Sequence, residues 1–449
     1  MGEWIMLAAL AQLALVGVVG AAPQRARVRA AARMGPGTSA LASPAAAACV
    51  DDAVATARSQ HMAEVALGRA AYAPREQDGA APMEPWRFDD ESFASPFAAC
   101  GLAGVHSTRA PVVSRAECDA LIAEASDAIT SGLSSSFTFT AASRLGEVHA
   151  SDLPRARVWL SRALPERFWP LLGSRFGADP ARLVVYDCLV VRYSAADGGV
   201  RQPVHRDAAL YTINVPLSAP SSFEGGGTWF ELTREVARLE RGHALAHASE
   251  LRHAGHRLRA GERWVLVLFA IVDDEPELAR RLGELAAAAR VDGRAHEASA
   301  VYERAIALAP ADHELHYGQA VARAAVGDER GAREAFARAA ALYPHCPRPH
   351  AALGTLALTA GETGVALAQF DAARALAADE AENAWWEAAV NGALCAALLA
   401  EAAGPASAGE WHSRLRDDAA RLHVALSCTP GGDKRLTDLV ARVEGLLAR

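Results

Sequence analysis

The chain has 449 residues, which is too long for one ordinary domain and predicts two or three. Hydrophobic residues make up 51% and charged residues 22%, so there is ample material for packed cores. The formal net charge of −8 argues against a nucleic-acid binder, because no excess of Lys and Arg is available to neutralise phosphates. The seven cysteines are scattered without a CxxC pair, so neither a Cys-rich metal site nor a disulfide scaffold is expected.

Residues 1–22 are predicted to be a signal peptide or a membrane anchor. The segment is almost wholly apolar from Trp4 and ends in the small residues Gly20, Ala21 and Ala22, a pattern typical of a cleaved secretory signal. Cleavage would place the protein in the secretory pathway, with the endoplasmic reticulum as the expected compartment. The run is also long enough to span a bilayer, and only as an uncleaved anchor would it bring membrane contact. The acid-free, Arg-rich stretch that follows also fits a plastid transit peptide.

Residues 23–108 are predicted to be a low-complexity leader and linker. Ala, Pro, Ser and Gly dominate from Met34 to Ala48. The stretch from Pro74 to Pro85 is broken and polar, so neither stretch supports a core. Folded structure is therefore expected to begin near Pro111.

Two helices are expected at the start of the next region, residues 109–274. Ser114 is a favoured N-cap residue, and Glu117 stands at the capping-box position of an amphipathic segment. A second helix is predicted from Leu153 through Phe176, where large apolar residues recur at helical spacing.

From Arg182 the pattern changes to short runs rich in β-branched and aromatic residues, separated by Gly-, Pro- or Ser-rich breaks. These strand-like runs are residues 183–193, 210–217, 228–232 and 264–272. Short strands in succession predict an all-β sandwich or jelly roll, with the preceding helices covering one face.

A candidate metal site falls among these strands. His205 and Asp207 stand one residue apart, and His253 follows further on. Two imidazoles and one carboxylate are the facial set that holds Fe(II) and leaves three coordination positions open. The His-x-Asp pattern alone is weak, because a solvated turn at a strand end also produces it.

Further pieces surround this pair in order along the chain. They are Val191-Arg-Tyr193, His205-Arg-Asp207, Phe223-Glu-Gly-Gly-Gly-Thr228, Gly242-His-Ala-Leu245, His253-Ala-Gly255 and Gly261-Glu-Arg-Trp-Val-Leu266. Together they make residues 184–272 resemble the catalytic domain of the Fe(II)- and 2-oxoglutarate-dependent dioxygenases, in particular the prolyl 4-hydroxylase-like group of the alpha subunit type. The resemblance covers about a third of the chain. It implies a double-stranded β-helix (jelly roll) oxygenase domain with N-terminal flanking helices.

The resemblance also implies a role for each site residue. His205, Asp207 and His253 would be the catalytic Fe(II) ligands. Arg263, ten residues after His253, would clamp the far carboxylate of 2-oxoglutarate. Tyr193 would contact the same cosubstrate, or it is a structural strand aromatic. Three other histidines crowd His253, at positions 243, 247 and 256, and His253 is preferred because the glycines and the arginine after it stand at the family's offsets.

The implied reaction is hydroxylation of a substrate C–H bond, at a prolyl or other residue of a protein or peptide. O2 and 2-oxoglutarate would be consumed, succinate and CO2 released, and L-ascorbate would keep the iron reduced. A different hypothesis is a catalytically inactive oxygenase fold that serves as a repeat-based adaptor.

Beyond residue 274 the sequence becomes Ala-rich with a 34-residue period. Aromatic residues and turn glycines recur at that spacing: Tyr302, Phe336 and Phe370, and Gly293, Gly327 and Gly361. Residues 278–412 thereby resemble tetratricopeptide repeats, an all-α solenoid whose concave face commonly binds peptides, so a protein partner is expected there. Residues 413–449 are predicted to be C-terminal capping helices. A generic Ala-rich helical bundle stays open as the alternative.

Overall fold

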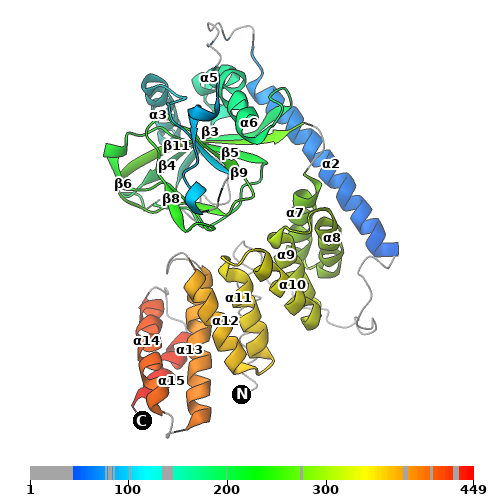
Figure 1. Ribbon diagram of the computed structural model, residues 1–449, viewed down its shortest axis with the longest axis vertical. Helices are drawn as coiled ribbons and strands as arrows, with labels where there is room; N and C mark the ends of the chain where they lie inside the picture. Colours follow the sequence, from blue (N-terminus) through cyan, green and yellow to red (C-terminus); the bar gives the residue numbers. More distant parts are fainter. Residues whose placement is uncertain are drawn as a thin grey trace. The chain divides into compact units, whose positions relative to one another are not determined.

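The computed structural model describes residues 44–448 except 76–77, 79–82, 84–85, 101, 103, 134–144, 199, 274–276, 378–382, 405–407 and 428–433. The chain divides into two compact units (Figure 1). The sheet unit is Arg58–Glu277, and the helical unit combines Leu278–Arg449 with the residues before Arg58. The predicted signal or anchor segment, residues 1–22, lies outside the described residues. None of the described helices combines the length and the apolar character that a membrane crossing requires.

Folded structure begins earlier than the sequence predicts, and the assignment of residues 23–108 to a leader and linker is wrong in part. Helix α2 occupies Pro44–Tyr72, and strands β1 (Phe93–Ala94) and β2 (Val105–Thr108) also lie in that segment. Low complexity is misleading here because alanine is the strongest helix former. Val50 and Val65 of α2 are buried, the first in the helical unit and the second in the sheet unit.

Two antiparallel sheets form the centre of the sheet unit. The larger sheet has the order β1-β2-β9-β5-β11-β4-β3, with β6 paired to β11, and the smaller has the order β10-β7-β8. The remaining strands are β3 (Gly146–His149), β4 (Leu183–Ser194), β5 (Tyr211–Pro216), β6 (Phe223–Gly225), β7 (Thr228–Phe230), β8 (Glu235–Ala237), β9 (Leu245–Ala248), β10 (His253–Gly255) and β11 (Leu258–Val272). The strand-rich part of the predicted fold class is thus confirmed as antiparallel sheet.

Helices cover one face of the larger sheet. They are α3 (Arg115–Thr130), α5 (Pro154–Ala163) and α6 (Trp169–Phe176), the last two joined through a π-helical turn at Leu164–Phe168. The predicted capping box at the start of α3 is present, since Ser114 and Glu117 each accept a hydrogen bond from the other's backbone N–H. Leu121 of α3, Leu160 of α5 and Leu171 of α6 share one buried core with Val190 of β4. Both predicted helices are present, the second divided into α5 and α6 by the π-helical turn.

Strand alternation separates this helix-covered face from the opposite one. Cys188 and Val190 of β4 pack in the core beneath the helices. Leu189, Val191 and Tyr193 belong to a second cluster on the other side of the strand. The second face lines the candidate site.

Helices alone make up the described part of the chain after Leu278. They are α7 (Leu278–Val291), α8 (Ala295–Leu308), α9 (His313–Ala325), α10 (Glu329–Leu342), α11 (Pro347–Thr359), α12 (Thr363–Leu376), α13 (Asn383–Ala403), α14 (Ala408–Ser427) and α15 (Lys434–Leu447). Helices α8, α10 and α12 begin 34 residues apart, so the period read from the sequence is present in the structure.

The residues that mark this period have the expected environments. Tyr302, Phe336 and Phe370 are all buried, and the turn glycines 293, 327 and 361 have φ angles of 81°, 81° and 80°. The predicted boundary between repeats and capping helices, at residues 412 and 413, is wrong because it falls inside α14. The period ends earlier, since α13 has 21 residues where the preceding helices have 13 or 14.

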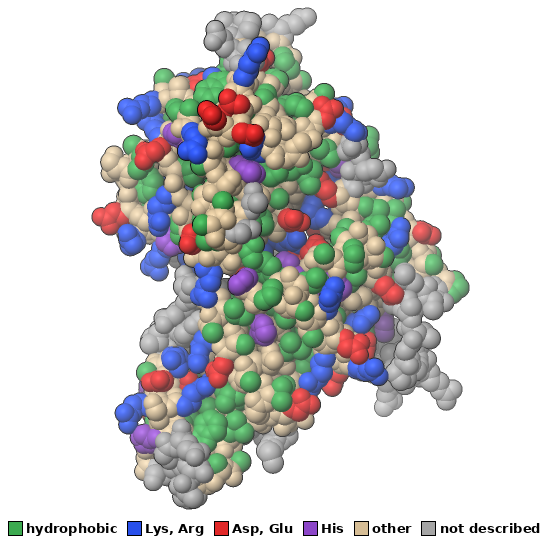
Figure 2. Space-filling model, viewed as in Figure 1, with side chains coloured by type: hydrophobic (Ala, Val, Ile, Leu, Met, Phe, Trp, Pro, Cys, Tyr) green, Lys and Arg blue, Asp and Glu red, His purple; other side chains and the backbone are tan. Residues whose placement is uncertain are grey.

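Charged side chains of both signs are interspersed on the face shown in Figure 2. Exposed ion pairs also occur, such as Arg330 with Glu334 at 3.0 Å in α10. Exposed pairs of this kind contribute little to stability individually, about 0.2 to 1 kcal/mol. Their main consequence here is a mixed surface instead of a field of one sign.

Candidate metal centre

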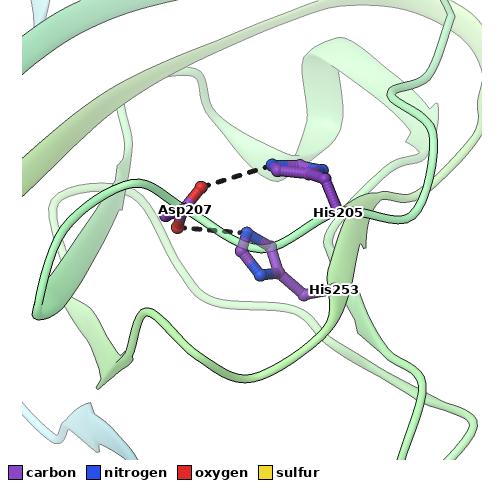
Figure 3. Close-up of side chains that lie close together, drawn as sticks. All are labelled: His205, Asp207 and His253. Atoms are coloured by element: carbon purple, nitrogen blue, oxygen red, sulfur yellow. Dashed lines mark ion pairs between the residues drawn. The ribbon is translucent and has the colours of Figure 1, made fainter. Parts of the chain in front are cut away.

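Three side chains singled out from the sequence converge in the sheet unit (Figure 3). Nε2 of His205 lies 3.3 Å from Oδ1 of Asp207, and Nε2 of His253 lies 3.4 Å from Oδ2 of the same carboxylate. One ligand atom from each residue lies within 4.8 Å of the others. Within the described part of the chain, no other group of His, Cys, Asp and Glu has the spacing of a metal site.

Backbone hydrogen bonds bring these distant segments together. The N–H of His205 donates to the carbonyl of His253 at 2.9 Å, and the N–H of His253 donates back at 3.0 Å. The N–H of Asp207 donates to the carbonyl of Ser249 at 3.1 Å. These backbone hydrogen bonds bring the segments of His205, Asp207 and His253 close together.

Both imidazoles present Nε2 to the carboxylate because Nδ1 is already engaged. Nδ1 of His205 lies 2.8 Å from the carbonyl oxygen of Pro203, and Nδ1 of His253 lies 2.8 Å from that of Leu251. A carbonyl oxygen only accepts, so each Nδ1 carries a proton and donates it. In a neutral ring this leaves the lone pair on Nε2, which is the tautomer that a metal ligand requires.

The electrostatics of the site favour an ionised carboxylate beside a neutral imidazole. Burial lowers the pKa of His253 to about 3. Burial also lowers the pKa of His205, but the hydrogen bond and charge of Asp207 outweigh it and raise that pKa above its usual value. Burial raises the pKa of Asp207, yet the neighbouring histidines hold it well below its usual range.

Two buried hydroxyl groups that were not predicted from the sequence support the carboxylate, Thr212 directly and Ser249 through Thr212. Thr212 Oγ1 donates to Oδ2 of Asp207 at 2.5 Å and lies 2.8 Å from Oγ of Ser249. Thr212 and Ser249 are each 0% exposed. Thr212 is conspicuous in the sequence as a polar residue inside the apolar run 210–217, but nothing in the sequence connects it with Asp207.

Arg263 lies in the same cavity, which is lined by residues including His205, Asp207, His253 and Tyr193. Arg263 is only 5% exposed, and this burial lowers the pKa of its guanidinium. Among the described residues, no carboxylate lies within ion-pair distance of this guanidinium. A buried charge without a counter-charge is costly, so the arrangement favours an anionic ligand.

Tyr193 and two glycines shape the space around Arg263. The Tyr193 hydroxyl donates to Oε1 of Gln202 at 2.8 Å, and the Arg263 guanidinium carbon lies 5.1 Å from the centre of the Tyr193 ring. A Cβ at Gly226 would come within 2.9 Å of Arg263 Cδ, and one at Gly255 would overlap the Tyr193 hydroxyl. Burial raises the pKa of Tyr193 to about 12, so the hydroxyl stays a donor.

The predicted turn at the glycine run is present, since residues 225–227 have φ angles of 83°, 63° and 107°. The contact between Gly226 and Arg263 was not predicted, because it depends on β6 pairing with β11. The glycines thus leave room for the guanidinium as well as forming the bend.

Of the four histidines at positions 243, 247, 253 and 256, His253 is the one that joins His205 and Asp207 in the group that could hold a metal ion. His247 is 0% exposed; its Nδ1 donates to the carbonyl of Ala248, and its Nε2 accepts from Asn214 Nδ2 at 3.4 Å. Both ring nitrogens of His247 are therefore occupied within the protein. It is a core residue that packs against His253, with ring centres 4.7 Å apart.

No family model matches this chain, and no curated protein matches it. Among solved structures, an oxidoreductase of the 2OG-Fe(II) oxygenase family from Burkholderia pseudomallei is 17% identical with a TM-score of 0.30, over 43% of this chain and 95% of that one. The viral collagen prolyl hydroxylase of Paramecium Bursaria Chlorella virus-1, as its 2OG complex, is 19% identical with a TM-score of 0.26, over 38% and 97%. The Sgt2 TPR domain from Aspergillus fumigatus is 20% identical with a TM-score of 0.27, over 29% and 85%.

The donor set around Asp207 and the buried cation in the same cavity are the two features of the sheet unit that indicate a function.

Proposed function

We propose that this protein is an Fe(II)- and 2-oxoglutarate-dependent dioxygenase that hydroxylates a C–H bond, at a prolyl or another residue of a protein or peptide. One observation carries the proposal: a single cavity contains both the His205, Asp207 and His253 group and the buried Arg263 guanidinium. The three metal-type ligands alone would fit several kinds of site. A dicarboxylate that reaches the metal with one end and a cation with the other accounts for both features together.

The donor set fits ferrous iron. His205 and His253 would offer neutral Nε2 atoms, Asp207 would offer its ionised carboxylate, and the Thr212 hydroxyl would hold that carboxylate in place. When bound, the iron with O2 and 2-oxoglutarate supplies the oxidation that places a hydroxyl group on a substrate carbon and yields succinate and CO2.

The rest of the cavity prepares the binding of the cosubstrate. Arg263 would pair with the far carboxylate, and Tyr193, fixed by Gln202, would flank it. Val191 and Val265 line the same space and exclude water, which strengthens the ion pair. By the resemblance to the prolyl 4-hydroxylase-like group, L-ascorbate is the reductant that we expect to keep the iron reduced.

For the architecture we propose a double-stranded β-helix for the sheet unit and a tetratricopeptide-like solenoid for α7–α12. The 34-residue spacing of α8, α10 and α12 supports the second assignment. Such a solenoid would bind a protein partner or present the peptide substrate.

The same repeat favours a second candidate, an inactive oxygenase fold that works as an adaptor. The clustering of His205, Asp207 and His253 and the buried guanidinium of Arg263, which has no carboxylate beside it among the described residues, speak against it, because an adaptor needs neither feature. Both candidate functions predict binding of a protein partner, but only the dioxygenase predicts turnover of 2-oxoglutarate.

The test uses the purified full-length chain with Fe(II), 2-oxoglutarate and O2. Proteins captured by the chain are added back, and succinate formation and the gain of one oxygen on captured proteins are measured by mass spectrometry. A dioxygenase should give both succinate and the added oxygen, and the His205→Ala and Asp207→Ala variants should give neither. Captured partners without succinate would favour the adaptor. Unchanged turnover in either variant would exclude the assigned metal ligands.

A further inference from the structure

A buried ion pair stands directly beside His253. Arg252 Nε donates to Oε2 of Glu231 at 2.7 Å, and the two side chains are 5% and 2% exposed. The other oxygen of the carboxylate, Oε1, is buried with no hydrogen-bond partner among the described residues. Apolar replacements of such pairs are often neutral or stabilising. Stability alone therefore does not explain why this pair is present.

The pair lies at the end of a very short ladder. Strand β10 contains three residues and pairs with β7 in a register that places His253 opposite Phe230. Glu231 and Arg252 are the next residues beyond this last pair, and the Glu231 N–H donates to the Arg252 carbonyl at 3.0 Å. Three residues provide few hydrogen bonds with which to define a register.

Register matters here because side chains alternate between the two faces of a strand. A slip of one residue would turn the His253 imidazole away from Asp207 and bring a neighbour in its place. The His253 ring packs near two other rings, with centres 5.9 Å from Phe230 and 4.7 Å from His247. Ring packing of this kind has no directional charged contact that would define the register. A directional charged contact supplies the specificity that this packing lacks.

We propose that Glu231 and Arg252 are positioning residues, whose ion pair fixes β10 against β7 and so holds the His253 imidazole at Asp207. The inference rests on the proposed metal site and adds to it a pair that touches neither metal nor cosubstrate. Replacing both charges by apolar side chains of similar volume would preserve the packing but remove the register contact.

The experiment compares the full-length wild type with Glu231→Met/Arg252→Met, both stripped of metal. Co(II) is titrated as the probe, its visible absorption reports affinity and coordination, and thermal unfolding reports stability. The double variant is expected to keep or raise its Tm while its Co(II) affinity falls 10- to 100-fold. Amide hydrogen exchange in β10 should accelerate without a matching change in β4.

The matched control is Asp78→Asn, which breaks another largely buried pair of the sheet unit, Arg157 with Asp78 at 2.6 Å. It should lower the Tm and leave Co(II) affinity unchanged. Arg252→Lys is the second variant, because it keeps the charge and loses the planar Nε–H donor; its Co(II) affinity should fall 3- to 10-fold.

A Co(II) affinity within twofold of wild type in the double variant would overturn the positioning role. If the double variant does not fold, Arg252→Lys decides, and wild-type affinity there would overturn it equally. A wild-type chain that binds no Co(II) would instead refute the metal site itself, so the two failures are distinguishable.

Discussion

Thr212 donates a hydrogen bond of 2.5 Å to the Asp207 carboxylate from a fully buried position on β5. The acceptor is Oδ2, the oxygen that also faces His253, whereas Oδ1 faces His205. A carboxylate held by a fixed donor cannot rotate freely, so Thr212 sets the direction in which Asp207 offers its lone pairs.

Removal of this donor should weaken metal binding. We expect Thr212→Val to lower Co(II) affinity about 10- to 100-fold and stability by about 1 to 3 kcal/mol, because a buried carboxylate oxygen loses its partner. Thr212→Ser keeps the hydroxyl and should restore most of the affinity. Isothermal titration of the metal-free variants measures the effect, and equal affinity for valine and threonine would refute the role.

Arg263 should control affinity for 2-oxoglutarate without affecting the metal. Loss of a buried charge partner costs about 2 to 5 kcal/mol, so Arg263→Ala should raise the KM for 2-oxoglutarate by about 30-fold or more. Co(II) affinity should stay at the wild-type value. The matched control is Arg259→Ala, because Arg259 lies on the same strand with an exposed side chain. A normal KM in Arg263→Ala would remove the basis for the cosubstrate assignment.

Features that depend on neighbouring residues in the sequence were predictable. The two members of the capping box, Ser114 and Glu117, are three positions apart, and β4 and the second half of β11 are rich in β-branched and aromatic residues. The 34-residue period can be found by comparing the sequence with itself. Residues 44–72 were misjudged for the same local reason, since alanine is common both in leaders and in stable helices.

The supporting groups of the site could not be predicted in this way. Thr212 meets Ser249 because β5 pairs with β9, and Glu231 meets Arg252 because β7 pairs with β10. These contacts depend on the register of strands that are three to six residues long. Spacing along the chain contains no information about these contacts, whereas the candidate ligands His205, Asp207 and His253 stand in a recognisable order.

A side chain at position 255 should be destabilising as long as residue 193 is a tyrosine with its hydroxyl group. A methyl group there would overlap the hydroxyl and displace it from Gln202. We expect Gly255→Ala to lose about 1 to 3 kcal/mol of stability and to raise the KM for 2-oxoglutarate. Adding Tyr193→Phe removes the clashing oxygen and should recover part of the stability, which thermal unfolding measures. Additive losses in the double variant would contradict this contact.

A control glycine lies far from any neighbour. A Cβ at Gly445 in α15 would meet no atom within 4 Å. Gly445→Ala should therefore be neutral or stabilising by about 0.5 to 1 kcal/mol.

Glu117 should make stability depend on pH in the acid range. Burial raises the pKa of its carboxyl, but hydrogen bonds from Arg167, Trp159 and Ser114 outweigh it and lower the pKa from 4.5 to about 2. A depressed folded-state pKa gives stability that is complete above the unfolded value of 4.5 and is lost as the pH falls toward 2. Glu117→Gln should therefore cost about 1 to 2 kcal/mol at pH 7, and its Tm difference from wild type should shrink between pH 4.5 and pH 2. The exposed Glu240→Gln serves as control, and a difference that stayed constant over this range would show that the ionised carboxylate contributes nothing.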